Sequence, residues 1–558
     1  MAKGEAPADL VLTNAQVVNV FSTEVILGNV AVSGGRIAGI GDYREGKEVL
    51  DLKGRFLAPG LIDGHTHLES SHLHPAEYAK AVVSRGTSGV VTDLHEIANV
   101  VGLDGIRYIM ACARRLPLDI YFMVPSCVPA THLETAGATL TADDLKTALR
   151  WKGVIGLGEM MNFPGVIYRD GEVLRKIDVS RGRVIDGHAP GLKGKNLNAY
   201  LAAGILSDHE CVALEEAREK LRGGMHIMIR EGSSEKNLET LLPLVADQTC
   251  SRCLFVVDDR TCADLLSEGD IDAVVRKAIR LGLDPVRAIQ LATINTAEYF
   301  RLDDVGAIAP GYFANFIVLD DLRTFRVSTV FYRGRKVAEN GKALFEATCL
   351  KDEKVTGTMH VKPFTVEALA LSPIGATLPV IEVVPGQIVT KRAEAKPSVE
   401  GGVVVPDVER DLLKLVVVER HHATGNIGRG LVKGFGLRSG ALATSIAHDS
   451  HNIVAVGTND GDIYGAVKEV ERLHGGVVAV QDGKVLASLA LPIAGLLSEE
   501  PLEVVVKKFE ELERVARELG SKLASPYATL SFMALPVIPE LRLTDKGMVD
   551  VLAFKLID

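Results

Sequence analysis

The 558-residue sequence lacks several features that would assign it to a special class of protein. Its most apolar stretch, residues 485–497, is interrupted by Ser488 and Pro492 and falls short of the roughly 20 residues that a membrane helix needs. Residues 1–10 contain no apolar run of the kind found in a secretory signal. Basic residues are not in excess either, since 62 Lys and Arg face 72 Asp and Glu. The resulting net charge of −10 argues against a nucleic-acid-binding surface. We therefore expect neither a membrane nor a nucleic acid as a partner.

Cysteine is scarce as well. Seven cysteines, an odd number, are scattered between Cys112 and Cys349, which favours reduced thiols and a cytoplasmic protein over a disulfide framework. Cys250 and Cys253 have C-x-x-C spacing, but no second pair accompanies them. Two buried thiols are therefore the better interpretation of that motif than a metal site.

The centre of the chain, residues 58–302, alternates short apolar runs with segments of helical periodicity. Eight such runs can be counted, and strands that alternate with helices indicate a parallel sheet. Eight strand–helix units over roughly 250 residues match the size of a TIM barrel. The sequence therefore predicts an α/β protein with a (β/α)8 barrel over residues 58–302, although residues 160–182 show the weakest helical pattern.

The flanking segments predict two further parts. Residues 1–57 and 303–345 contain short runs of Val, Ile and Leu separated by Gly, Asn and Asp, which favours one composite β-sandwich beside the barrel. Residues 346–378 are less patterned and are expected to form a connection. Residues 379–558 combine glycine-rich β runs with a helix over 501–519, which predicts a C-terminal α+β domain. The helical stripe formed by Val505, Phe509, Leu512, Ala516 and Leu519 is typical of a packed face.

Metal-ligating and acidic residues stand at the ends of several predicted barrel strands. The first run ends in His65-Thr66-His67, and residues two apart on a strand point to the same side. Later runs end in Glu159, His188, His209 and the pair Asp258-Asp259. The carboxyl ends of barrel strands form the active-site face, so these side chains are expected to converge. Imidazoles and carboxylates together suit two divalent first-row metal ions.

Each of these residues also has a purely structural explanation. A single His-x-His pair carries little information, a lone histidine can be a core residue, and Asp258 or Asp259 can cap a helix. Their joint position at strand ends favours the metal site. A second cluster lies in the C-terminal domain and contains His421, His422, His448, Asp449 and His451. For this cluster a metal site, turn caps and a lid over the barrel mouth remain open alternatives.

The sequence around these residues carries a family resemblance. PGLIDGHTHLESS resembles the first metal-binding strand of the amidohydrolase superfamily. More narrowly, the chain is similar to the bacterial and archaeal adenine deaminases, through HEIANVVG, GLGEMMNFPGV, DGHAPGLKGKNLNAYLAAGILSDHECV and, near the C-terminus, VERHHATGNIGRG and AHDSHNIVAVGTND. The resemblance covers nearly the whole chain.

This resemblance implies roles for particular residues. It assigns His65, His67, His188 and His209 as metal ligands, Glu159 as the bridging carboxylate, and Asp258 as the strand-eight acid. The choice of Asp258 over Asp259 rests on register, since the metal-site acid usually comes first in such pairs. The two ions are expected to be Mn²⁺ or Fe²⁺, and the protein is expected to be a homodimer.

The implied reaction is the hydrolysis of adenine to hypoxanthine and ammonia. In it Glu159 and Asp258 transfer protons, and the ions activate water. Asp93, His95 and Glu96, at the end of the second strand, are expected to bind the imidazole side of the purine; a third metal ion there is an alternative. Two other functions compete with this one: another amidohydrolase activity on a related cyclic C–N bond, and a scaffold protein that has lost its metal.

Overall fold

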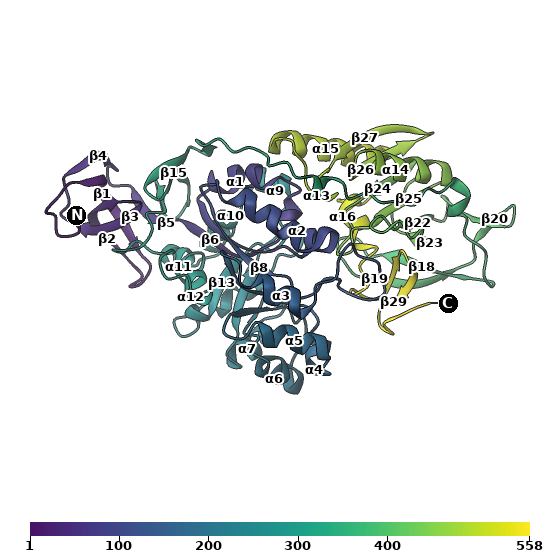
Figure 1. The fold of residues 1–558 in the computed structure, drawn as a ribbon, viewed down its shortest axis with the longest axis horizontal. Coiled ribbons are helices and arrows are strands. Elements are labelled where there is room, and N and C mark those ends of the chain that lie inside the picture. Colours follow the sequence, from purple (N-terminus) through teal and green to yellow (C-terminus); the bar gives the residue numbers. More distant parts are fainter. Residues whose placement is uncertain (558) are drawn as a thin grey trace.

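The computed structural model describes residues 1–557, which form three parts arranged in a row. A β-rich part that holds the N-terminus lies at one end, a strand–helix barrel lies in the middle, and a mixed domain that holds the C-terminus lies at the other end (Figure 1). Among residues 1–557 no helix is both long enough and apolar enough to cross a membrane.

Eight parallel strands build the central part, in agreement with the predicted α/β barrel. Five of them form one sheet in the order β10-β9-β8-β7-β6 and three form a second sheet in the order β11-β12-β13. Nearly every residue of these strands is buried, which is typical of parallel strands covered by helices. The strands are β6 (Leu61–Thr66), β7 (Thr87–Asp93), β8 (Asp119–Val124), β9 (Val154–Met160), β10 (Val184–Gly187), β11 (Ser207–Asp208), β12 (His226–Arg230) and β13 (Cys253–Val256).

The two sheets meet along two seams. At the first seam, just beyond β13, Asp258 N donates to His65 O at 2.9 Å and His67 N donates to Asp258 O at 3.1 Å. At the second seam side chains replace the backbone ladder, because Gly187 N donates to Ser207 Oγ at 3.0 Å. The first seam therefore closes the barrel through backbone groups of three residues that the sequence places at the metal site.

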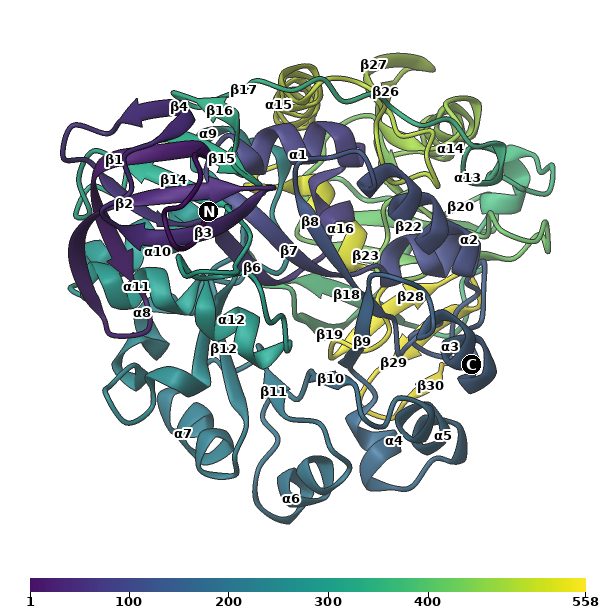
Figure 2. The ribbon, with the colours of Figure 1, turned by 60° about the vertical axis from the view of Figure 1, so that its left-hand side comes forward.

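Helices surround the barrel strands (Figure 2). The most amphipathic is α10, whose buried Val274, Val275 and Ala278 recur at helical spacing and face the strands. The barrel helices are α1 (Pro75–Val83), α2 (His95–Ala113), α3 (Ala142–Ala148), α4 (Phe163–Ile167), α5 (Gly171–Val179), α6 (Gly194–Ala202), α7 (Leu214–Arg222), α8 (Leu238–Leu241), α9 (Cys262–Ser267), α10 (Ile271–Arg280), α11 (Pro285–Leu291) and α12 (Ile294–Tyr299). Short 3₁₀ turns occupy Leu68–Ser71, Leu242–Leu244 and Cys250–Arg252.

Residues 160–182, where the helical pattern is weakest, nevertheless contain α4 and α5. Their starts are specified by caps rather than by apolar spacing, since Asn162 accepts from Gly165 N and Asp170 accepts from Glu172 N. Cys250 and Cys253 are both buried and form no disulfide bond, as the sequence predicts.

The N-terminal strands and the strands after the barrel belong to one nine-stranded sheet. The two segments join where β5 pairs with β14, with Phe316 opposite Pro59. A shared core that includes Leu12, Val17 and Phe316 lies against the sheet. The strands are β1 (Ala8–Asn19), β2 (Glu24–Ser33), β3 (Arg36–Gly41), β4 (Gly46–Asp51), β5 (Phe56–Pro59), β14 (Phe316–Leu319), β15 (Val327–Tyr332), β16 (Arg335–Glu339) and β17 (Lys342–Ala343).

Beyond residue 345 the chain carries two single turns, α13 (Glu353–Thr356) and a 3₁₀ turn (Val366–Leu369), before the C-terminal domain begins. That domain is built on an eight-stranded sheet in the order β19-β18-β23-β22-β25-β24-β26-β27. Its strands are β18 (Leu378–Val383), β19 (Thr390–Ala395), β22 (Leu412–Val418), β23 (Ile427–Lys433), β24 (Ala441–Thr444), β25 (Ile453–Gly457), β26 (Gly476–Gln481) and β27 (Lys484–Ala490).

Three helices and two small sheets complete the domain. The helices are α14 (Asp460–Arg472), α15 (Leu502–Glu518) and α16 (Pro526–Phe532), and the small sheets consist of β20 (Ser398–Glu400) with β21 (Val403–Val405), and β28 (Leu541–Thr544) with β29 (Gly547–Asp550) and β30 (Lys555–Leu556). Helix α15 is the one that the sequence predicts over 501–519, with Pro501 at its N-cap and with Val505, Leu512 and Ala516 buried.

A buried lysine ties the second seam together. Lys220 on α7 has no exposed side-chain surface, and its Nζ donates to Asp208 Oδ2 at 2.9 Å, to Ala189 O at 2.6 Å and to Glu216 Oε1 at 2.7 Å. The other oxygen of Asp208 accepts from Ala189 N at 2.8 Å. Lys220 and Asp208 thus join the segment that follows β10 to the end of β11.

We predict that Lys220→Met destabilises the protein by about 3–5 kcal/mol, because it leaves Asp208 buried without its cation. The free energy of unfolding in urea, followed by circular dichroism, measures this effect. Arg218→Met on the same helix is the matched control: Arg218 forms an exposed pair with Glu215 and its loss is expected to change stability by less than about 1 kcal/mol. Equal stability of the two variants would contradict the structural role of Lys220.

Candidate active site

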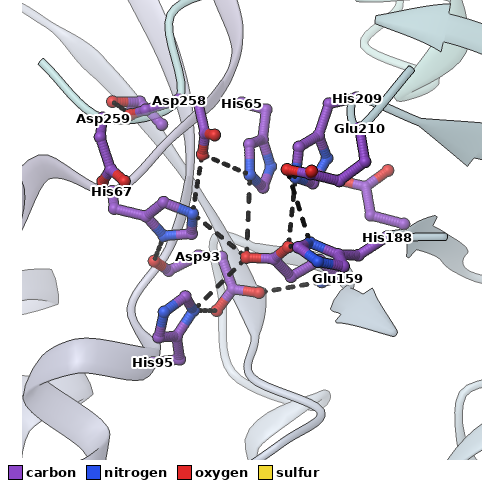
Figure 3. Close-up of polar contacts among 12 residues, drawn as sticks. His65, His67, Asp93, His95, Glu159, His188, His209, Glu210, Asp258 and Asp259 are labelled. Atoms are coloured by element: carbon purple, nitrogen blue, oxygen red, sulfur yellow. Dashed lines mark hydrogen bonds and ion pairs between the residues drawn. The ribbon is translucent and has the colours of Figure 1, made fainter. Parts of the chain in front are cut away.

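Six predicted ligands meet at the carboxyl ends of the barrel strands (Figure 3). His65 and His67 lie at the end of β6, Glu159 on β9, His188 after β10, His209 after β11, and Asp258 after β13. All except His188 are at least nine-tenths buried. The eightfold strand arrangement therefore brings together residues that lie up to 193 positions apart in the sequence.

Glu159 stands at the centre of the cluster and its two oxygens face different histidines. Oε1 lies 3.2 Å from His67 Nε2 and 4.0 Å from His65 Nε2. Oε2 lies 2.6 Å from His188 Nδ1 and 3.2 Å from His209 Nε2. A carboxylate that divides its oxygens between two imidazole pairs has the geometry of a bridge between two ions.

Asp258 completes the first of these two groups. Its Oδ1 lies 3.1 Å from His67 Nε2 and 3.4 Å from His65 Nε2. Its Oδ2 accepts from Arg230 Nη1 at 2.7 Å. The backbone of Asp258 has a φ of 63°, a left-handed conformation that aspartate tolerates better than most residues. The neighbouring Asp259 instead accepts a hydrogen bond from Ser70 Oγ, so the two carboxylates face different partners.

The imidazoles are prepared to bind a cation. His67 Nδ1 donates to the carbonyl oxygen of Asp93 at 2.9 Å, which leaves Nε2 directed at the cluster. Both ring nitrogens of His65 and Nδ1 of His209 are buried without a hydrogen-bond partner. Burial and the charge of His209 lower the pKa of His65 to about 4, so its ring is neutral. Orphaned nitrogens of buried imidazoles beside two carboxylates fit divalent metal ions.

The carboxylates are ionised in spite of their burial. Burial by itself raises the pKa of Glu159, but His188, His209 and His67 hold the pKa well below its usual value. Burial also raises the pKa of Asp258, but its contacts with His65 and His67 together with the charge of Arg230 outweigh the effect of burial. Two charged carboxylates in a buried site require cations, and among the described residues Arg230 is the permanent cation in contact with Asp258.

The second-strand residues lie beside this centre. Asp93 Oδ2 accepts from Glu159 N at 2.9 Å, so Asp93 holds the backbone of the bridging residue. Gly158 makes this contact possible, because a Cβ there would lie 1.8 Å from Asp93 Oδ2. His95 Nδ1 lies 3.6 Å from Glu159 Oε1, and its Nε2 lies 3.5 Å from Glu96 Oε1. His95 therefore stands between the metal ligands and Glu96.

Sequence reasoning had assigned no role to several residues of the site. Arg230, at the end of β12, contacts both Asp258 and Glu210. Glu210 Oε1 also lies 3.6 Å from His209 Nε2. Arg230 and Glu210 both stand at the ends of predicted strands, and this position is the sequence signal that points to the site. Glu96, by contrast, is held by His448 and His451 of the C-terminal domain, a pairing for which the sequence contains no local signal.

Comparisons with known proteins agree with this geometry. The model of the amidohydrolase family matches residues 56–337, and that of the adenine deaminase C-terminal domain matches residues 387–555. An adenine deaminase of Dehalococcoides mccartyi is 63% identical over 557 residues, which cover 100% of this chain and 98% of that protein. The chain belongs to the adenine deaminase family.

Other relatives extend the family likeness. Adenine deaminase 2 of Carboxydothermus hydrogenoformans is 51% identical to this chain and also covers 100% of it and 98% of its own length. Among solved structures, the L-hydantoinase (dihydropyrimidinase) of Arthrobacter aurescens is 14% identical, covers 61% of this chain and 98% of its own, and has a TM-score of 0.48. The amidohydrolase family model, which matches residues 56–337, covers the barrel with strands β5, β14 and β15, whereas β1 to β4 lie outside the match.

Measurements of metal affinity test whether Asp258, rather than Asp259, is the metal ligand. We expect Asp258→Asn to weaken divalent metal affinity by about tenfold or more. Even the substitution of a residue that only orients a ligand typically lowers metal affinity by about 10–100-fold. Asp259 faces Ser70 instead, so Asp259→Asn serves as the matched control, with an expected change in metal affinity below twofold. Competition with a colorimetric chelator, followed by elemental analysis, measures both. Normal affinity in Asp258→Asn together with loss in Asp259→Asn would reverse the assignment.

Proposed function

We propose that this chain hydrolyses adenine to hypoxanthine and ammonia, as a metal-dependent deaminase of its family. The observation that carries the proposal is the position of Glu159, whose two oxygens serve separate imidazole groups at the mouth of a complete barrel. Family membership over the full length of the chain supports the substrate. The intact ligand geometry favours an enzyme over a metal-free scaffold.

His65, His67 and Asp258 with one oxygen of Glu159, and His188 and His209 with the other, would hold two divalent ions. Such ions supply, when bound, the electrostatic field that lowers the pKa of water to near neutrality. We propose Mn²⁺ or Fe²⁺, because imidazole and carboxylate ligands suit both and the family resemblance points to them. A cytoplasmic homodimer remains part of the proposal on the same resemblance.

The reaction requires two proton transfers by the chain. Attack of water at C6 forms the C6–O bond, and Asp258 is placed to accept a water proton because its Oδ1 faces the centre of the cluster. The ionised Glu159 accepts the second proton of water and delivers it to N1, which compensates for the lost aromaticity of the ring. Asp258 then passes its proton to the amino nitrogen, the C6–N bond breaks and ammonia leaves. The two protons of water thus end on N1 and on the departing nitrogen.

The imidazole side of the purine is assigned to the residues that follow β7. Glu96 is buried and lies on the far side of His95 from the metal ligands. Burial raises the pKa of Glu96, but His448 and His451 hold it well below the usual value, so the carboxylate is an acceptor for a ring N–H. Asp93 supports this region through the backbone of Glu159.

Ammonia release from adenine tests the function directly. The protein is freed of metal with a chelator, reconstituted with Mn²⁺ or Fe²⁺, and assayed with adenine, adenosine, guanine, cytosine and dihydroorotate. We expect turnover with adenine only, and only after reconstitution. No ammonia from adenine after full metal loading would overturn the proposal, and ring opening of dihydroorotate would favour the related amidohydrolase activity.

Glu159→Gln is expected to lower kcat/KM for adenine by about 10²–10⁴-fold, the range typical of a lost general acid or base. Metal content measured on the same sample separates the two roles of Glu159: lost turnover at full metal content isolates proton transfer, and lost metal isolates the ligand role. Glu215→Gln, an identical change at an exposed position, is the control and should behave as wild type. Near-normal turnover in Glu159→Gln would remove Glu159 from the mechanism.

A further inference from the structure

The C-terminal domain reaches the barrel through the loop between β24 and β25, residues 445–452. The loop is anchored on the barrel side, since Asn452 Nδ2 donates to Thr135 O at 2.8 Å. It is anchored within its own domain as well, because His421 Nε2 donates to Ser450 O at 2.7 Å. Three buried or nearly buried side chains of this loop face the end of β7: His448, Asp449 and His451.

Both oxygens of Glu96 are held by this loop. His448 Nδ1 donates to Glu96 Oε1 at 2.6 Å, and His451 Nε2 donates to Glu96 Oε2. Glu96 is itself only 3% exposed. A carboxylate with a donor on each oxygen has lost the rotational freedom of its terminal torsion, so its remaining lone pairs point in fixed directions.

The two histidines are themselves fixed before they meet Glu96. Ala447 N donates to His451 Nδ1 at 3.2 Å, so Nδ1 is an acceptor and Nε2 must carry the proton that is given to Glu96. The ring of His448 stacks on Phe532 of α16, with centroids 4.7 Å apart and an angle of 14° between the planes. Each donor is thus oriented by groups of the C-terminal domain alone.

A third residue of the loop faces the same region. Asp449 Oδ1 lies 4.0 Å from His95 Nε2, the nitrogen of His95 that also faces Glu96. The opposite nitrogen, Nδ1, faces Glu159. The loop therefore reaches to within one imidazole ring of the metal ligands, which places it at the substrate site rather than at a remote domain contact.

We propose that His448 and His451 are positioning residues that fix the Glu96 carboxylate for the N–H of the purine imidazole ring, so that the C-terminal domain supplies one wall of the adenine site. This inference rests on the proposed deamination of adenine. The two histidines touch Glu96 and not the reacting atoms, so their effect is on substrate binding: loss of either raises KM for adenine while kcat changes little.

The test compares two substitutions at one position. His448→Phe keeps a ring to stack on Phe532 and removes the N–H donor, whereas His448→Asn supplies an amide N–H close to the former Nδ1. We expect His448→Phe to raise KM for adenine by about tenfold to a hundredfold, the loss typical of a hydrogen bond to a buried charge. His448→Asn is expected to recover most of it. His451→Gln, which retains a donor near the former Nε2, is expected to resemble His448→Asn, and His451→Phe to resemble His448→Phe.

A second ligand distinguishes positioning from general damage to the structure. 9-Methyladenine has no N–H on its imidazole ring and gains nothing from an oriented Glu96. In His448→Phe its inhibition constant against adenine is expected to stay within about threefold of wild type while KM for adenine rises. Equal weakening of both ligands, at unchanged metal content and thermal midpoint, would mean a structural role and overturn the proposal.

A double-mutant cycle shows whether the histidines act through Glu96. If they do, His448→Phe adds nothing to the defect of Glu96→Gln, whereas independent effects would multiply. His474→Asn is the control, since His474 is exposed in the same domain and its left-handed backbone suits asparagine. Wild-type protein that deaminates adenine while all His448 and His451 variants keep a normal KM refutes this inference alone. Wild-type protein without adenine turnover refutes the proposed function instead.

Discussion

Glu159 carries a charge in a place where only 3% of its surface is exposed, and the free energy of an ionised carboxylate there depends wholly on its neighbours. Five imidazoles approach its two oxygens, and Asp93 holds its backbone N–H. Gly158 must be glycine because Asp93 occupies the space of a side chain. The end of β9 is therefore specified in detail by one buried charge.

The residues that face this charge also take part in closing the barrel. The first seam has no regular ladder, and its two backbone hydrogen bonds involve His65, His67 and Asp258. The residues that close the barrel are thus the residues that face Glu159. The left-handed backbone of Asp258 turns its carboxylate toward the histidines, where Arg230 balances part of the negative charge.

The part of this arrangement that could be predicted from sequence follows from periodicity. Strand ends in a barrel share one rim, so His65, His67, Glu159, His188 and His209 could be placed together without knowledge of any distance. Which of Asp258 and Asp259 points its carboxylate at the histidines depends on a single backbone φ, and no residue pattern encodes that angle. The helical pattern of residues 160–182 is weak because caps at Asn162 and Asp170 specify where α4 and α5 begin.

The contact between Glu96 and the C-terminal histidines lies further beyond sequence reasoning, because 352 residues separate Glu96 from His448. Two separate domains must fold before this pair exists, and the orientation of each histidine comes from its own domain. Such a division has a physical consequence for the barrel. A buried Glu96 without its two donors would be an uncompensated charge, and burial would raise its pKa. The C-terminal domain therefore keeps Glu96 ionised, which is the charge state that the proposed recognition of a purine N–H requires.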